Sequence, residues 1–186
     1  MFARLVSCAL LACALPARAQ VAPLEVTVTR ADVDDEHVFA VNASGAVQAA
    51  PMAVWKVLTN YERMPEFVPD LQTSRVIARM GSDVVVEQFG VARFMFMSRD
   101  IHLLVRVTEV PITAIDIGLI NGDMKVYSCR WELVPLASGG TRINYTGKMV
   151  PRFYVPGFLG ANIIRSDIQR MMTAVLARLD KPDQDK

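Results

Sequence analysis

The sequence is poor in the residues that most often bind metals or carry enzyme chemistry. Its 186 residues include three cysteines and two histidines, His37 and His102. No group of His, Cys, Asp or Glu has the spacing of a metal site. A phosphate loop, a dinucleotide fingerprint and a Gly-x-Ser-x-Gly elbow are also missing. We therefore expect no metal, no cofactor and no catalytic residue that a motif identifies.

An excess of charge of one sign is also lacking. The chain has 20 basic and 19 acidic residues. This balance lacks the basic patch typical of nucleic-acid-binding proteins, and it gives no general attraction to anionic membranes. Hydrophobic residues nevertheless make up 52% of the chain. No uncharged run approaches the roughly 20 residues of a membrane-spanning helix. The apolar side chains must therefore face inward, onto a core or onto a ligand.

The first 19 residues have the three-part pattern of a secretory signal peptide. A basic start is followed by the apolar run Leu5–Leu15, and Ala17-Arg18-Ala19 supplies a cleavage site after Ala19. We expect a protein of the periplasm or the exterior. The alternative is a lipoprotein that begins at Cys13. Cleavage after Ala19 would leave one cysteine, Cys129, hence no internal disulfide, and we interpret it as a small buried hydrophobe.

The remaining chain predicts one domain that mixes strands and helices. A strand is expected over 37–47, and Pro51 suits the first turn of a short helix ending near Thr59. A second helical piece over 61–64 is stopped by Pro65. From residue 71 the apolar pattern has a period of two, and turn residues divide it into strands. These strands are expected near 71–79, 83–97, 100–109, 113–120, 124–135 and 141–150.

Most of these strands have one apolar and one polar face. In 124–135, Tyr127, Cys129 and Trp131 alternate with polar residues, as a half-buried antiparallel strand requires. The 83–97 segment is less regular, since Glu87 shares a side with apolar residues. A β-bulge near Gly90 would explain it.

A long helix follows the strands, over about 158–179. Its apolar residues recur every three or four positions and form one stripe. The stripe consists of Ala161, Ile164, Ile168, Met171, Met172, Val175 and Leu179. A helix of this length can cross a whole sheet.

Three segments resemble a known family. AVWKVLTNYERMPEFVPDLQTSRVI, NGDMKVYSCRWEL and GTRINYTGKMVPRFYVPGFL are similar to the START-like (SRPBCC) superfamily, in its polyketide cyclase/dehydrase or coenzyme Q-binding type branch. The resemblance implies an α+β helix-grip fold, in which a curved antiparallel sheet wraps around the long C-terminal helix and two short helices follow the first strand. The implied organisation is a signal peptide (1–19), an N-terminal leader (20–36), the START-like domain (37–180) and a polar tail (181–186).

The resemblance also implies an apolar cavity between the sheet and the C-terminal helix. Its expected lining is Phe94, Phe96, Ile117, Leu119, Tyr127, Trp131, Tyr145, Ile164, Ile168, Met171, Met172 and Val175. The alternative is that the same side chains simply fill the core. A separate apolar cluster of Phe153, Tyr154, Val155, Phe158 and Leu159 either fastens the helix to the sheet or makes a transient membrane contact.

Three functions remain open at this point. The first is an exported carrier that binds a hydrophobic small molecule or lipid, with an isoprenoid quinone as one candidate. The second is a cyclase- or dehydratase-type enzyme on an apolar substrate. The third is a protein-interaction module. The fold alone does not choose among them.

Overall fold

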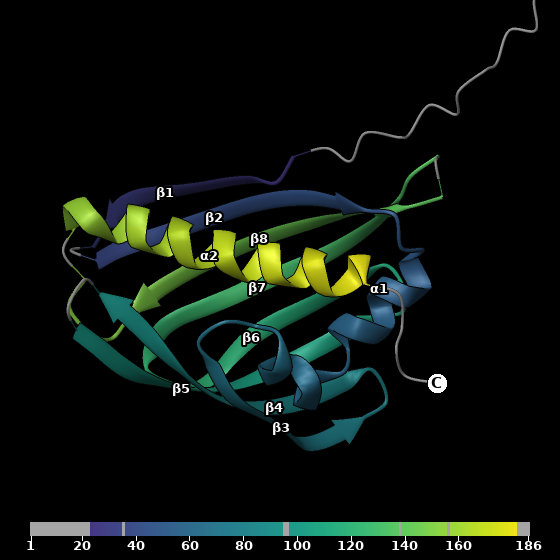
Figure 1. Ribbon diagram of the computed structural model, residues 1–186. Coiled ribbons are helices and arrows are strands. Elements are labelled where there is room, and N and C mark those ends of the chain that lie inside the picture. Colours follow the sequence, from purple (N-terminus) through teal and green to yellow (C-terminus); the bar gives the residue numbers. More distant parts are fainter. Residues whose placement is uncertain (1–22, 35, 95–96, 138, 156, 182–186) are drawn as a thin grey trace, which may run out of the picture.

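The computed structural model describes residues 23–34, 36–94, 97–137, 139–155 and 157–181. This part of the chain forms one sheet, two α-helices and one 3-10 helix (Figure 1). In chain order the elements are β1 (Glu25–Val33), β2 (Glu36–Val47), α1 (Pro51–Leu58), the 3-10 helix η1 (Tyr61–Glu66), β3 (Leu71–Met80), β4 (Asp83–Phe94), β5 (Met97–Val110), β6 (Ala114–Gly122), β7 (Met124–Pro135), β8 (Thr141–Pro151) and α2 (Gly157–Asp180).

The sheet is antiparallel and open. Its eight strands have the order β1-β2-β8-β7-β6-β5-β4-β3, so β1 and β3 are the edges. The sheet curves around one side of the long helix α2, and α1 lies near the end of that helix (Figure 1). This is the helix-grip arrangement that the sequence predicted.

The predicted strands from residue 71 onward all form, with bounds within a few residues of the expected ones. At the N-terminal side the sheet extends further than expected. Residues 25–33, which the sequence placed in a leader, form the edge strand β1 and pair with β2 along its length. The alternating side chains of β1, among them Val26 and Val28, pack against the core.

The irregularity predicted near Gly90 lies on the neighbouring strand. β4 pairs with β5 without interruption from Asp83 to Phe94. Opposite Gly90 and Phe89, the register of β3 shifts between Leu71 and Thr73, and it shifts again between Val76 and Ala78. Glu87 shares a side with apolar residues because this side is the outer face of the sheet. There Phe89 stacks on His102 at 4.5 Å, and His102 Nε2 lies 3.1 Å from the Glu87 carboxylate.

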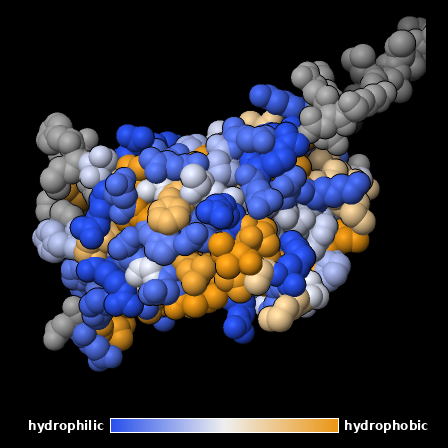
Figure 2. Space-filling model, turned by 90° about the horizontal axis from the view of Figure 1, so that it is seen from below, coloured by the Kyte–Doolittle hydropathy of each residue, from blue (hydrophilic) through white to orange (hydrophobic). Residues whose placement is uncertain are grey.

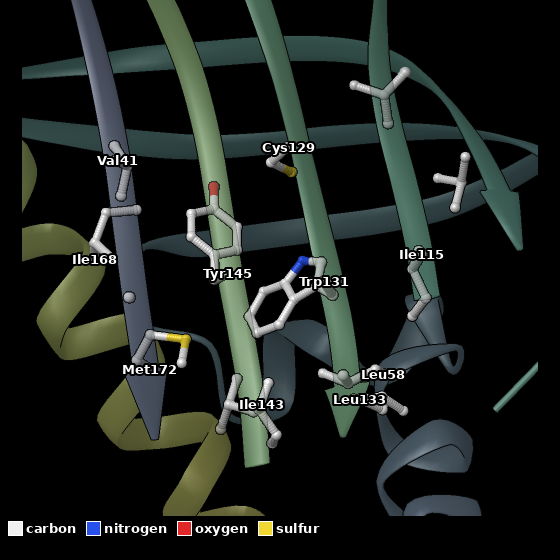
Figure 3. Packing of buried hydrophobic residues seen from close by; sticks show 14 of the residues in the cluster. Val41, Leu58, Ile115, Cys129, Trp131, Leu133, Ile143, Tyr145, Ile168 and Met172 are labelled. Atoms are coloured by element: carbon white, nitrogen blue, oxygen red, sulfur yellow. The ribbon is translucent and has the colours of Figure 1, made fainter. Parts of the chain in front are cut away.

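The core lies between the inner face of the sheet and α2. The stripe predicted for the helix is confirmed, since Ile168, Met172, Val175 and Leu179 are all buried. They meet inward side chains of β2, β8 and β7 (Figure 3). The helix packs mainly on β1 and β2. Seen from below Figure 1, the outside of the molecule is largely polar, with one compact apolar patch (Figure 2).

Candidate functional site

A cavity of about 250 Å³ opens between α2 and the half of the sheet that α2 does not cover. One wall is α2 and the opposite wall is formed by β4, β5 and the start of β7. The segment between η1 and β3 closes a third side. The lining residues are Val68, Pro69, Asp70, Leu71, Gly90, Val91, Ala92, Ile101, Leu103, Tyr127, Asp167, Ile168, Arg170 and Met171. We call this cavity the α2 pocket. Its lining is mostly apolar, with charged groups in three positions.

Asp70 forms the sharp corner that shapes the pocket. Its φ is +63°, in the left-handed region that non-glycine residues seldom adopt. The Asp70 carbonyl accepts a hydrogen bond of 2.9 Å from the Val91 amide, which ties the corner to β4. A Cβ atom on Gly90 would lie 2.7 Å from the same carbonyl. The close approach of the corner to β4 therefore requires glycine at position 90.

Four charged side chains form ion pairs at the pocket. The Arg170 guanidinium on α2 lies 2.9 Å from the Asp70 carboxylate and 2.6 Å from that of Asp167. Arg93 on β4 reaches the other oxygen of Asp70 at 2.6 Å. Burial raises the pKa of Asp167, although Arg170 opposes the change. The Asp70 carboxylate thus joins α2 to β4, and we call these four residues the rim.

A second polar group lies deeper, inside the core. The Cys129 thiol donates a hydrogen bond of 3.9 Å to the Tyr127 hydroxyl. Tyr145 interacts with both groups, and its ring packs edge-on against Trp131 with the centroids 4.9 Å apart. Gly147 makes room for this arrangement, because a Cβ there would lie 3.2 Å from the Tyr145 hydroxyl. Figure 3 shows the Tyr145 oxygen, the Cys129 sulfur and the Trp131 indole nitrogen in one region.

These deep groups are held in their neutral forms. Burial raises the pKa of Cys129 to about 11, although its hydrogen bonds with Tyr145 and Tyr127 lower it. The pKa of Tyr145 is raised chiefly by burial, and that of Tyr127 chiefly by the nearby Cys129 and then by burial. The thiol and the two hydroxyls are therefore neutral hydrogen-bonding groups at physiological pH. Cys129 is the small buried residue that the sequence suggested.

The structure divides the predicted lining residues into three sets. Tyr127, Ile168 and Met171 line the α2 pocket. A second set belongs to the packed core or to its border, and it consists of Ile117, Trp131, Tyr145, Ile164, Met172 and Val175. Leu119 is half-buried outside that cluster. Phe94 is described only in its backbone, and Phe96 lies outside the described residues.

Sequence reasoning missed the pocket's rim. It predicted a break in the helical pattern at Pro65, but it had no reason to bring the segment after Pro65 against α2. Asp70, Arg93 and Arg170 lie far apart in the chain, and each reads as an ordinary exposed charge. The one local signal is that Asp70 follows a proline, where turns are common.

The outer face of the sheet carries a larger but open hollow of about 800 Å³. It crosses the centre of five strands from β2 to β5, where small side chains leave space, and Gly118 has nothing within 4 Å of where its Cβ would be. Its border is polar and includes Arg106, Arg130 and Lys148. This hollow faces solvent, on the opposite side of the sheet from α2.

The apolar cluster before α2 is divided between core and surface. Tyr154 is 83% exposed, whereas Val155 beside it is buried in the core. The Arg99 guanidinium lies 4.9 Å from the Phe153 ring centroid, in cation–π geometry. Leu159 is half-buried, and the side chain of Phe158 lies outside the described residues. Part of the cluster thus fastens the helix, and part of it faces outward.

The described residues contain no group of three or more His, Cys, Asp or Glu that could hold a metal ion. In the same part of the chain, no helix is both long enough and apolar enough to cross a membrane.

Solved structures with the same fold include lipid carriers and cyclases. A START superfamily protein from Mycobacterium smegmatis superposes with a TM-score of 0.67 at 16% identity, covering 76% of this chain and 97% of its own. A STAR-related lipid transfer protein from Xanthomonas axonopodis gives 0.63 at 16% identity, over 83% of this chain and 99% of its own. The Zhui aromatase/cyclase from Streptomyces sp. R1128 gives 0.64 at 15% identity, over 77% and 92%.

Sequence comparison identifies the family directly. No curated protein sequence matches the chain. The family model described as polyketide cyclase/dehydrase and lipid transport matches residues 47–176, which include everything from α1 to most of α2. The chain therefore belongs to the polyketide cyclase/dehydrase and lipid transport family, and it has the fold of the START superfamily protein from Mycobacterium smegmatis.

Proposed function

We propose that the protein is an exported carrier that holds a hydrophobic small molecule or lipid in the α2 pocket. The observation that carries this proposal is the uneven packing beneath α2. Met172 and Val175 are fully enclosed in the core, whereas Met171, next in sequence to Met172, lines an open apolar cavity. A cavity with an apolar lining and a few polar groups is the usual form of a small-molecule site.

The size of the pocket defines what it takes up. Its volume of about 250 Å³ is near the lower limit of ligand pockets, so it holds one ring system or a short length of chain. A long lipid would keep its remaining length outside the rim. An isoprenoid quinone, with a flat ring and an apolar tail, meets this requirement and remains our candidate.

Export and membrane contact complete the proposal. Residues 1–19 direct the protein out of the cytoplasm as a cleaved signal peptide. Near the start of α2, the exposed Tyr154 and the Phe153–Arg99 pair combine aromatic rings with a cation. Such a combination suits the interface of a membrane, where the ring enters the headgroup region and the cation meets lipid phosphate. There the carrier exchanges its ligand.

Native mass spectrometry of protein purified from an exporting host tests this function. We expect a chain that begins at Gln20, and a fraction of it should carry a noncovalent adduct with the mass of a lipid or other apolar compound. The Met171→Phe variant, which fills the pocket, should lose the adduct. A diacylated chain starting at Cys13 would contradict the cleavage site. A clean apo mass, together with no uptake of added apolar probes, would contradict the carrier.

A second candidate function is an enzyme of the cyclase or dehydratase type. The observation that favours it is Asp167, which lines the pocket and whose pKa burial raises, as in general acids. The Asp167→Asn variant distinguishes the two functions. A carrier keeps its ligand affinity when this carboxylate is lost, whereas an enzyme loses turnover with little change in substrate binding.

A further inference from the structure

The hollow of about 800 Å³ on the outer face of the sheet has a floor of small residues. We call it the outer hollow. Strand pairing places four of its lining residues in one row across β5, β6, β7 and β8, and they are Arg106, Gly118, Ser128 and Lys148. The row thus has a long cationic side chain at each end, with a glycine and a serine between them. The space exists because these two middle positions have no large side chain.

The outer hollow has an excess of positive charge, although the charges of the whole chain nearly balance. Its lining contains three cations, Arg106, Arg130 and Lys148, but one carboxylate, that of Asp116. The Arg130 guanidinium lies 2.5 Å from the Asp116 carboxylate, so these two charges cancel. Arg106 and Lys148 form no ion pair with any other described residue. Two positive charges around the outer hollow are therefore available to an anion from outside.

Hydroxyl groups and apolar side chains complete this surface. Ser128 and Thr146 line the outer hollow, and a hydroxyl group can donate a hydrogen bond to an anionic oxygen. Ile120, two residues after Gly118 and on the same face of β6, also lines it and is 46% exposed. Val126 has the corresponding position on β7, two residues before Ser128, and is 40% exposed. The surface thus suits a molecule that combines an anionic head with an apolar body.

We propose that the outer hollow is a second binding site, which takes up a small organic phosphate monoester. The phosphate lies between Arg106 and Lys148, over the gap at Gly118, and the apolar part of the molecule lies against Ile120. A phosphate monoester carries about two negative charges at neutral pH and has three acceptor oxygens, which match the two unpaired cations and the hydroxyl groups. The volume is within the range of small-molecule sites. Because this site lies across the sheet from the α2 pocket, the inference does not depend on the carrier function.

Three probes test the proposal by isothermal titration calorimetry at low ionic strength. They are 2-naphthyl phosphate, neutral 2-naphthol and inorganic phosphate. A hydrogen bond to a charged group stabilises more than a neutral one, so 2-naphthyl phosphate should bind roughly tenfold or more tightly than 2-naphthol. Inorganic phosphate, which lacks the apolar part, should also bind more weakly. The affinity for 2-naphthyl phosphate should fall as sodium chloride is added, because salt screens exposed charges. In methyl-resolved NMR its binding should shift the signal of Ile120 and leave those of Ile101 and Met171 in place.

Variants locate the bound phosphate. Arg106→Gln and Lys148→Gln should each weaken the binding of 2-naphthyl phosphate about tenfold, since each removes a charge-assisted hydrogen bond. Lys56→Gln is the matched control, because it removes a cation on α1 that does not line the outer hollow, and it should leave the affinity unchanged. Gly118→Leu should abolish binding with little change in the thermal melt, because its side chain enters open space.

Three results would overturn this inference while leaving the carrier function in place. The first is no binding of 2-naphthyl phosphate, or binding no tighter than that of 2-naphthol. The second is an equal loss of affinity in Lys56→Gln and in the two variants at the outer hollow. The third is an NMR shift of Ile101 and Met171 in place of Ile120, which would assign the phosphate to the α2 pocket.

Discussion

The two halves of the sheet's inner face differ in how α2 covers them. The helix packs closely on β1 and β2, which lie next to β8 in the sheet, and a Cβ on Gly45 would lie only 2.7 Å from Leu176. At β4 and β5 the helix stands off, and the α2 pocket occupies the gap. We call the first region the packed half and the second the open half. Both belong to one continuous sheet.

The difference shows how one domain can be both stable and able to bind. The packed half buries large side chains such as Phe39, Ile143 and Met172 completely, which contributes hydrophobic stabilisation. The open half also has buried valines on β4 and β5, but polar contacts are added where the pocket opens. The Asp70 carbonyl accepts a backbone hydrogen bond from Val91 on β4, and the ion pairs of the rim join α2 to the same corner, so the walls of the pocket are fixed by contacts at its edge.

The largest effect should come from emptying the core. Trp131→Ala removes a buried aromatic side chain that packs against Tyr145, and it should lower the free energy of unfolding by about 3–5 kcal/mol. Phe89→Ala is the control, because Phe89 is an aromatic residue on the outer face, and it should cost far less. Chemical denaturation of both variants measures this. A small loss of stability in Trp131→Ala would mean that the core around Trp131 is loosely packed.

Two neighbouring methionines should respond oppositely to the same substitution. Met172→Phe forces a larger ring into the packed half and should cost about 1–3 kcal/mol of stability. Met171→Phe places the ring in the pocket, where space exists, and should cost little while abolishing the binding of apolar probes. Stability and probe binding are measured in the same samples. Equal destabilisation by both changes would show that the pocket is a filled part of the core.

The corner at Asp70 can be tested through the glycine it approaches. Gly90→Ala puts a methyl group 2.7 Å from the Asp70 carbonyl and should destabilise by about 1–3 kcal/mol, because backbone atoms must shift. Gly118→Ala is the matched control, since its methyl group would meet open space on the outer hollow. Thermal melts compare the two variants. Equal melting temperatures would mean that the corner does not rest on β4.

The rim should contribute little to the stability of the fold and more to the rate at which a ligand leaves the pocket. Arg170→Gln breaks two partly exposed ion pairs, and such pairs are worth about 1 kcal/mol or less. Its stability should therefore change little. The dissociation rate of a bound apolar probe should increase, because α2 is no longer joined to Asp70. Stopped-flow displacement provides the rate, with Arg178→Gln near the helix end as control. An unchanged dissociation rate in Arg170→Gln would show that the rim does not control the release of the ligand.

The sequence predicted the fold well because strand alternation and helical periodicity are local signals. The positions of the strands, the inner face of β7 and the apolar stripe of α2 followed from them. The position of the pocket did not, because it depends on how far a helix stands from a sheet. Met171 and Met172 look alike in the sequence, and only the packing separates them. The sequence placed β1 in a leader for a similar reason, because only pairing with β2 makes these residues an edge strand of the sheet.

Methyl-resolved NMR during a titration with 2-acetylnaphthalene tests the central claim most directly. If the open half is the binding site, the methyl signals of Ile101, Leu103 and Met171 should shift with a common dissociation constant, while those of Ile143 and Val175 stay in place. Shifts confined to Ile143 and Val175, or to Ile120 on the outer hollow, would contradict the assignment of the α2 pocket as the site of binding.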